Sequence, residues 1–309
     1  MASPLPTPEL ALFPSFRRAT VTAFAAAAAL LATALPAHAT DTLDRDYTGT
    51  VHTDAACAQS RGTSGQAWPL AVSFDPLSTG ALSRVVLPLQ PYLAGSPAVT
   101  IQVVDAWGPT SPRYYVLAEA TVPAATVLAG PAGPTGYGHV VDVAFAQRPV
   151  LRKGDRYFVV IRVADDPAGT SSYCVGRTTS SQVQTFMTGN EQNGETTWLS
   201  PPPTAGKVVV LSDYLTTAAS KLSVAPWVNR FPVSSPVVRY RAELTAGNVL
   251  VPGEQVTFSA DGRTLCTATT DTHGIAECEG GLPGPTGFDA TFAGTSLLLP
   301  TTGHGGLVV

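Results

Sequence analysis

Basic side chains are scarce in this sequence. Lys and Arg together number 18 against 22 Asp and Glu, which gives a formal net charge of −4, and charged residues make up only 13% of the chain. A protein that binds nucleic acid needs an excess of Lys and Arg to neutralise phosphates. This charge balance therefore excludes nucleic acid as an expected partner.

The motifs of the common catalytic sites are also missing. The sequence contains no Gly-x-Ser-x-Gly, no His-Glu-x-x-His, no phosphate-binding loop and no dinucleotide fingerprint. The nearest approach to the first of these, Gly62-Thr63-Ser64-Gly65, is one residue short. We therefore expect a non-catalytic protein that needs no cofactor. A glycan-cleaving enzyme with two carboxylates stays open as an alternative, and its candidate residues are Asp105, Glu119, Asp142 and Glu195.

Metal ligands do not gather anywhere along the chain. No two cysteines form a Cys-x-x-Cys pair and the histidines are scattered, so the spacing typical of zinc sites is absent. Several aspartates lie near each other in segment 41–54, but they lack the spacing of a known calcium loop. We expect no metal site, because solvation of the surface explains these aspartates.

The first 39 residues have the pattern of an export signal. An arginine pair at 17–18 precedes an apolar run at 19–35, and Ala-His-Ala at 37–39 matches the small-x-small cleavage pattern. An uncleaved membrane anchor is the alternative, because the run is at the lower limit of the roughly 17–25 residues that span a bilayer. The cleavage pattern favours removal after Ala39, which leaves a secreted chain without a second apolar stretch of membrane length.

Alternation of apolar and polar residues recurs after residue 40 and predicts half-buried strands. In the stretch DRYFVVIRV, Tyr157, Val159 and Ile161 share one face and Arg162 lies on the other. Turn clusters separate such segments, in a chain with 28 Gly and 27 Pro, and no convincing amphipathic helix is present. We expect an all-β fold in which residues 40–217 form a jelly-roll-like β-sandwich.

A second module is expected from residue 218 to residue 309. It contains a series of short strand candidates within about 90 residues, which is the size of an immunoglobulin-like sandwich. The join at 216–220 is short, small and polar, as expected of a linker. The sequence therefore predicts two β-sandwich modules in tandem after a signal peptide, in a chain that we expect to be a monomer.

The even number of cysteines favours disulfides in an exported chain, and three pairings are possible. The cysteines are Cys57, Cys174, Cys266 and Cys278. In the stretch RTLCTATTDTHGIAEC, a hairpin centred on Thr272 would place Cys266 directly opposite Cys278, within disulfide range. Gly274 can supply the positive φ that such a turn needs. We therefore favour the pair Cys266–Cys278, which leaves Cys57 with Cys174.

The same C-terminal region carries a family pattern. VPGEQVTFSADGRTLCTATTDTHGIAECEGG, followed by FDATFAGTSLLLPTT, combines Pro-Gly-x-x-Val-x-Phe, an Asp-Gly turn, Thr-x-x-x-Gly-x-Ala and Phe-x-Ala-x-Phe-x-Gly. This pattern resembles the bacterial immunoglobulin-like repeats of secreted and surface proteins, and it covers about residues 221–309. The resemblance implies an extracellular sandwich. One departure from the pattern is Thr295, where many members of the family carry Asp. With Thr at this position, the chain lacks the turn residue or cation ligand that Asp would supply.

Three segments of the N-terminal module carry a looser pattern. It consists of Phe-x-Pro-x-x-x-Gly-x-Leu in SFDPLSTGALSRVVLPLQ, a Gly-Pro turn, and Pro-Val-Leu-x-x-Gly-x-x-Tyr in the stretch that leads to Val163. Over about Leu70 to Val163 the module resembles the choice-of-anchor type of secreted bacterial β-sandwich. No general activity attaches to such modules. The resemblance implies an extracellular sandwich that binds glycan or protein.

The chain ends LPTTGHGGLVV, in which Leu299–Gly303 spells the pentapeptide that sortases cut. A sortase substrate continues with an apolar membrane segment and a basic tail, whereas His304–Val309 contain no Lys or Arg. Those residues fall far short of the ~20 that span a membrane. We expect instead that they form the last strand of the sandwich, and that the protein is not sortase-anchored.

Aromatic residues in turns are the candidate ligand-binding residues. Trp107 lies in the loop between two predicted strands, Tyr114 and Tyr115 stand at the other end of that loop, and Trp198 lies in GETTWLSPPP. Exposed rings stack on the apolar faces of sugars, although each ring alternatively caps its own end of the sandwich. We expect adhesion, or binding of polysaccharide or cell wall, through the N-terminal sandwich. The alternative is a purely structural module, or one that binds a cell-surface protein.

Overall fold

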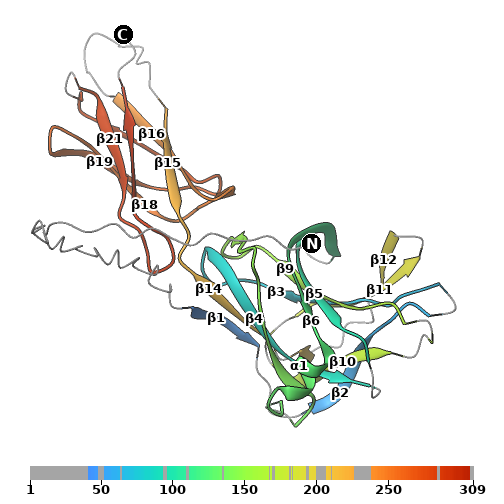
Figure 1. Cartoon of the computed structure of the whole chain (residues 1–309). Coiled ribbons are helices and arrows are strands. Elements are labelled where there is room, and N and C mark those ends of the chain that lie inside the picture. The colour runs from blue at the N-terminus through green and yellow to red at the C-terminus, as the bar shows by residue number, and fades with distance from the viewer. Residues whose placement is uncertain are drawn as a thin grey trace, which may run out of the picture. The chain divides into compact units, whose positions relative to one another are not determined.

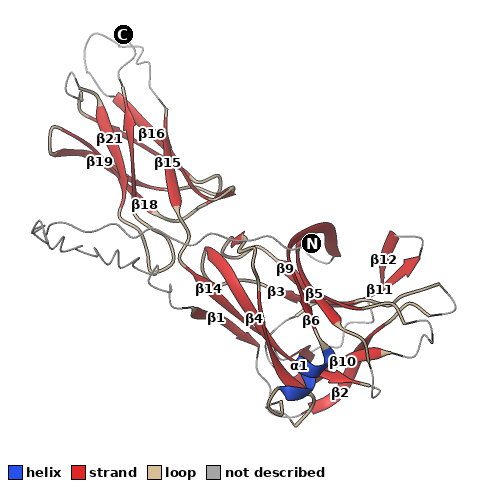
Figure 2. Cartoon of the chain, viewed as in Figure 1, coloured by secondary structure: helices blue, strands red, loops and turns tan. Residues whose placement is uncertain are grey.

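Strands dominate the computed structural model, which describes residues 41–306 with internal gaps (Figure 1). The positions not described between these limits are 48–51, 63–64, 93–95, 109–110, 134–135, 167, 169–170, 181, 183, 193–194, 200–206, 210, 226–237 and 284–285. The expected signal peptide, 1–39, lies outside the described residues. Among the described residues, Figure 2 shows strands in both halves of the chain and the short helix α1, so the expected all-β fold is confirmed.

Residues 42–216 form two antiparallel sheets that face each other across one core. The first sheet contains eight strands: β1 (Thr42–Tyr47), β2 (His52–Gln59), β4 (Gly80–Pro91), β7 (His139–Ala144), β8 (Val150–Leu151), β10 (Ser172–Thr179), β13 (Lys207–Val209) and β14 (Leu211–Thr216). The second contains six strands, in the order β12 (Glu195–Leu199), β11 (Phe186–Gln192), β3 (Leu70–Phe74), β9 (Tyr157–Val163), β5 (Val99–Trp107) and β6 (Ser111–Val122). The helix α1 (Ala124–Ala129) follows β6.

Alternate residues of both sheets build the core of this sandwich. Val159 and Ile161 of β9 point into it and are fully buried, and Leu82 of β4 meets them from the opposite sheet. Burial of a side chain of this size contributes about 1.5–3 kcal/mol. The alternation predicted for β9 is confirmed, and it turns Val160 and Arg162 to the outer face of the six-stranded sheet.

Residues 220–305 form two further sheets of four strands each. The first contains β15 (Ser220–Val224), β16 (Val238–Ala246), β17 (Val249–Leu250) and β20 (Ile275–Gly280). The second has the order β19 (Arg263–Thr269), β18 (Gln255–Ala260), β21 (Phe288–Phe292) and β22 (Thr301–Gly305). Their common core includes Tyr240, whose ring centroid is 4.8 Å from that of Phe288 and 5.8 Å from that of Phe258. The proposed module boundary at 217/218 stays a prediction.

The Asp-Gly turn expected in this region is present between β18 and β19. Asp261 and Gly262 form its two-residue tip, with φ angles of 50° and 74°. A turn with positive φ at both central residues matches the twist of the two antiparallel strands that it joins. Asp followed by Gly is favoured in such a turn, which explains these two residues. Ala260 and Arg263 pair directly across the turn.

The first expected disulfide lies within one sheet. Cys57 on β2 is directly opposite Cys174 on β10, with Cα atoms 3.9 Å apart. The two cysteines are 117 residues apart in sequence, so the bridge ties the beginning of the sandwich to a late strand. The predicted pairing is confirmed.

The second expected disulfide is also present, but the hairpin used to predict it is wrong. Cys266 and Cys278 are bonded, with Cα atoms 6.2 Å apart. However, β19 pairs with β18 and β20 pairs with β16, so Cys266 lies opposite Phe258 and Cys278 lies opposite Tyr240. The turn at Gly274 forms, with φ of 70°, but there the chain crosses from one sheet to the other. The disulfide therefore joins two facing sheets.

The LPTTG pentapeptide runs into the last described strand. Residues 301–305 form β22, in which Thr302 pairs with Thr291 and Gly303 pairs with Ala290 of β21. The Thr302–Gly303 peptide bond is thus part of a paired strand, which favours the interpretation of this segment as folded structure. The strand begins at Thr301, earlier than expected, and the expected continuation at 307–309 lies outside the described residues.

Candidate functional site

Two of the three aromatic side chains expected around the β5–β6 loop, Trp107 and Tyr115, are exposed. Trp107 ends β5 with 71% of its surface exposed, and Tyr115 is 70% exposed. Tyr114 and Tyr115 belong to β6 rather than to the loop, and the side chain of Tyr114 lies outside the described part of the structure. Neither Trp107 nor Tyr115 lines the two hollows described below.

The third candidate region holds Trp198, which lies on β12 directly opposite Gly189 of β11. A Cβ atom on Gly189 would stand 2.7 Å from Cγ of Pro69, 2.8 Å from Cγ2 of Thr196 and 3.1 Å from Cζ3 of Trp198. These distances are too short for non-bonded carbon atoms. Glycine at position 189 is therefore what lets the indole lie close to the sheet.

A small apolar cluster lies beneath the indole, on the face of the six-stranded sheet that points away from the main core. Its buried members are Ala71, Val104, Phe158, Val160 and Met187. Trp198 is half-buried and packs against this cluster. The indole therefore has a structural role as a cover for these side chains, and it also presents part of its surface to solvent.

Two adjoining hollows lie on the same outer face. The larger has a volume of about 420 Å³, within the range of roughly 300–1,000 Å³ of small-molecule sites. Its lining combines the apolar side chains Val104, Val116, Val160 and Trp198 with the polar side chains Gln102, Arg113, Arg162, Glu191 and Thr196. The smaller, of about 170 Å³, shares Arg162 and Glu191 with the first and adds Arg61 and Asp165.

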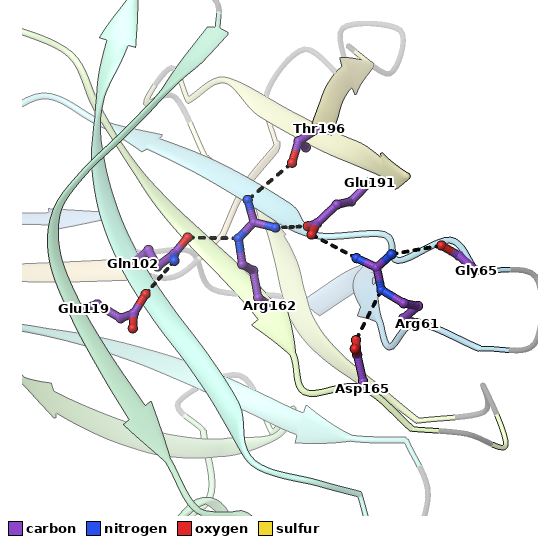
Figure 3. A network of polar contacts seen from close by, with 8 residues as sticks. All are labelled: Arg61, Gly65, Gln102, Glu119, Arg162, Asp165, Glu191 and Thr196. Carbon is purple, nitrogen blue, oxygen red and sulfur yellow. Dashed lines mark hydrogen bonds and ion pairs between the residues drawn. The ribbon is translucent and has the colours of Figure 1, made fainter. Parts of the chain in front are cut away.

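Arg162 is the centre of the polar side of these hollows (Figure 3). Its Nε donates a hydrogen bond of 2.9 Å to Oε1 of Gln102, and one terminal nitrogen donates to Oε2 of Glu191. The other terminal nitrogen reaches Oγ1 of Thr196 at 3.4 Å. Gln102 in turn donates to Oε2 of Glu119 at 2.6 Å. The guanidinium is thus held from three sides by strands β5, β11 and β12.

Glu191 extends this chain of contacts to a second arginine. Its Oε1 accepts a hydrogen bond of 3.1 Å from Arg61, whose other terminal nitrogen donates to the carbonyl of Gly65 at 3.1 Å. Nε of Arg61 is 3.5 Å from Asp165. Figure 3 shows the result, a continuous row of polar groups from Glu119 to Asp165 across the sheet.

The strand arrangement explains why Arg162 meets Glu191 although β3 lies between their strands. Strand β3 begins at Leu70, which pairs with Ile161, so no β3 residue stands beside Arg162. Three residues before the start of β3, the backbone at Ala67 pairs with Glu191. The start of β3 therefore leaves an opening that the arginine and glutamate side chains bridge.

Sequence reasoning found Trp198 and the outward direction of Arg162, but it missed the network. Arg162 and Glu191 are 29 residues apart, and Arg61 and Glu191 are 130 residues apart. The one local signal was an arginine on the solvent side of a strand whose other side is entirely apolar. An arginine in this position covers the outer face of the sheet and needs a partner for its guanidinium, but the sequence does not reveal which residue supplies it.

The carboxylates considered for glycoside cleavage do not all lie on one face. Glu119 is on the outer face of the six-stranded sheet, where its carboxylate accepts from Gln102. Asp142 lies on β7 of the other sheet and pairs with Arg84 at its exposed surface. Since the outer faces of the two sheets point in opposite directions, Glu119 and Asp142 do not form a catalytic pair.

The carboxyl group with the most perturbed pKa lies elsewhere, in the eight-stranded sheet. Asp213 on β14 is fully buried, and burial is the largest cause that raises its pKa to about 8, followed by repulsion from Asp44. Backbone N–H groups and the side chain of Arg45 oppose this shift, although neither oxygen makes a well-formed hydrogen bond. Asp213 lines neither hollow.

Within the described residues, no group of three or more His, Cys, Asp or Glu side chains is placed to hold a metal ion. The described part of the chain also contains no helix that is long and apolar enough to cross a membrane.

Comparison with known proteins identifies no family. No family model matches the chain, and no curated protein matches it. Among solved structures it is similar to a Ca²⁺-stabilised adhesin that helps an Antarctic bacterium bind ice, at 16% identity over 84% of this chain and 73% of that chain. The TM-score is 0.22, and a likeness this distant carries no argument about function.

Proposed function

We propose that this chain is an exported, non-catalytic protein that binds carbohydrate through the outer face of its six-stranded sheet. In this proposal it serves adhesion to a polysaccharide or cell-wall surface. Its C-terminal sheets form an immunoglobulin-like module of the bacterial type, as the sequence pattern of that region implies.

The observation that carries the proposal is the division of the larger hollow into an apolar and a polar side. The half-buried ring of Trp198 and the exposed side chain of Val116 offer a surface on which the apolar face of a sugar ring can stack. Arg162 and Gln102 border the same hollow and can exchange hydrogen bonds with hydroxyl groups. A sugar ring has an apolar face and a polar edge, so this lining is complementary to it.

The two disulfides support a location outside the cytoplasm. The bonds Cys57–Cys174 and Cys266–Cys278 persist in oxidising compartments and are rare in the cytosol. This agrees with the export signal predicted at residues 1–39.

The engagement of the carboxylates supports binding rather than catalysis. Glu191 contacts two guanidinium groups, and Glu119 accepts a hydrogen bond from Gln102. A hydrolase would need one carboxylic acid and one carboxylate free to face the scissile bond.

Pull-down with insoluble polysaccharides and bacterial cell-wall sacculi tests the proposal. The test variant is Trp198→Leu, which keeps an apolar cover over Met187 but removes the ring. The matched control is Trp107→Leu, the same change at an exposed ring outside the hollows. We expect one polymer to retain the protein and the Trp198 change to weaken retention by about tenfold, with the control unaffected. Retention by no polymer would contradict the proposal.

A protein partner is the second candidate function, and the exposed hairpin β5–β6 favours it. Trp107 and Tyr115 are large, mostly exposed rings on one hairpin, and aromatic side chains are enriched in protein interfaces. Loss of surface binding in Trp107→Leu but not in Trp198→Leu would move the site to this hairpin.

A further inference from the structure

We propose that the outer-face site selects uncharged polysaccharides over acidic ones, and that Glu191 is the residue that sets this preference. The inference rests on the proposed function, because it names the ligand class of the same site. Its basis is the pairing of charges around the two hollows, which is independent of the aromatic lining.

Each described guanidinium that lines the hollows has a carboxylate partner within the protein. Arg162 contacts Glu191, and Arg61 contacts both Glu191 and Asp165. Arg113, on the rim of the larger hollow, lies 3.3 Å from Asp105. An acidic glycan needs a cation that is free to pair with its carboxylate, and these three are already paired.

Glu191 forms ion pairs with two of the three arginines at once. Its side chain is only 20% exposed, and those of Arg61 and Arg162 are 29% and 28% exposed. Interactions between charges are stronger in such a partly enclosed position than on an open surface. A uronic acid carboxylate would therefore have to compete with a carboxylate that the sheet already holds in place.

The remaining charges also oppose an acidic ligand. Glu119 ends the polar row on one side and Asp165 ends it on the other. Together with Glu191 and Asp105 they outnumber Arg61, Arg113 and Arg162. Glu119 and Asp105 lie beside the hollows rather than in their lining, and with them the local sum of charges is slightly negative. An anionic polymer laid along the row meets like charge at both ends.

An uncharged sugar meets none of these penalties. Its hydroxyl groups both donate and accept, so they can bond to carboxylate oxygens, to the Gln102 amide and to the Thr196 hydroxyl without separating an ion pair. For an uncharged sugar, the paired arginines and carboxylates act as fixed hydrogen-bonding groups. The same ion pairs disfavour an acidic glycan.

Titration calorimetry on the purified protein tests this inference. The probes are a neutral β-linked glucose oligosaccharide and an oligogalacturonate of equal length, measured at low salt and at physiological salt. The test variant is Glu191→Gln, which keeps the size and one oxygen acceptor but removes the charge. The matched control is Glu195→Gln, the same change at an exposed residue of β12 outside both hollows.

We expect the unmodified protein to bind the neutral oligosaccharide at least about tenfold more tightly than the oligogalacturonate. Glu191→Gln should shift that ratio toward the acidic ligand by about tenfold, most clearly at low salt, while Glu195→Gln leaves it unchanged. Tighter binding of the oligogalacturonate by the unmodified protein would overturn the inference alone. An unchanged ratio in a folded Glu191→Gln variant would also overturn it. Binding of neither probe, nor of any polymer in the pull-down, would overturn the proposed function itself.

Discussion

Cys266 and Cys278 join two facing sheets of the C-terminal half of the chain, although only a short turn separates their strands. Their separation in sequence is 12 residues, yet each pairs with a different sheet neighbour, Phe258 and Tyr240 respectively. The disulfide therefore joins two different sheets, whereas a disulfide within a hairpin would join two neighbouring strands of one sheet. Its contribution to stability comes from closing a short loop across the sandwich.

Removal of this bridge should lower stability moderately. A double change, Cys266→Ala with Cys278→Ala, should reduce the free energy of unfolding by about 2–3 kcal/mol, because a short loop closes with little loss of unfolded-state entropy. Urea unfolding followed by circular dichroism measures the change. No loss of stability would indicate that the sheets are held by core packing alone.

Removal of the Cys57–Cys174 bridge should cost more. It closes a loop of 117 residues, for which the chain-entropy argument gives about 5 kcal/mol. The double change to Ala should therefore shift the urea midpoint of the N-terminal sandwich further than the C-terminal pair shifts its own. The reverse order of the two effects would contradict the loop-length argument.

Asp213 should make the protein less stable as the pH rises. Its pKa is about 8 in the fold and 3.8 ordinarily, so between these values the folded state keeps a proton that the unfolded state releases. Stability should then fall by up to about 1.4 kcal/mol per pH unit over this window. The charged side chains that affect it most are Asp44 and Arg45 of β1.

Asp213→Asn isolates this effect, because the amide does not titrate. Urea unfolding at pH 5, 6.5 and 8 should show a smaller decline for the variant than for the unmodified protein, with the largest gain in stability at pH 8. The same decline in both proteins would mean that the proton of Asp213 is not retained in the fold.

Gly189→Ala should disturb the candidate site through packing. The added methyl would lie 2.7 Å from Pro69 and 3.1 Å from Trp198, and overpacking of this kind costs about 1–3 kcal/mol. We expect a lower melting temperature and a shift in the Trp fluorescence spectrum. Gly306→Ala is the control, since a Cβ there meets nothing within 4 Å.

The strands were predictable because their signal is local. Alternation in DRYFVVIRV predicted which side chains of β9 enter the core, and β9 spans Tyr157–Val163 as expected. Alternation does not identify the neighbouring strand, however. The segments around Cys266 and Cys278 are both strands, as the hairpin prediction requires, but the short turn between them does not make them pair with each other.

The candidate site was predictable only in part, for the same reason. The sequence marks Trp198 as an aromatic near a turn and Arg162 as an outward side chain. Their common hollow depends on where β3 begins and on the space above Gly189, which are properties of three or more strands together. Glu191, which connects the two arginines, carries no local signal at all.

The position of Cys57 and Cys174 also determines how the chain responds to tension. If the two ends of the protein are pulled apart, force passes directly from one cysteine to the other through the bond between opposed strands. The segment between them, whose ends are 117 residues apart in sequence, cannot extend, which withholds roughly 400 Å of contour length at about 3.4 Å per residue. Strands β3, β5, β6 and β9 lie within that interval and stay shielded from extension, whereas β11 and β12, which carry Glu191 and Trp198, lie outside it and bear the load.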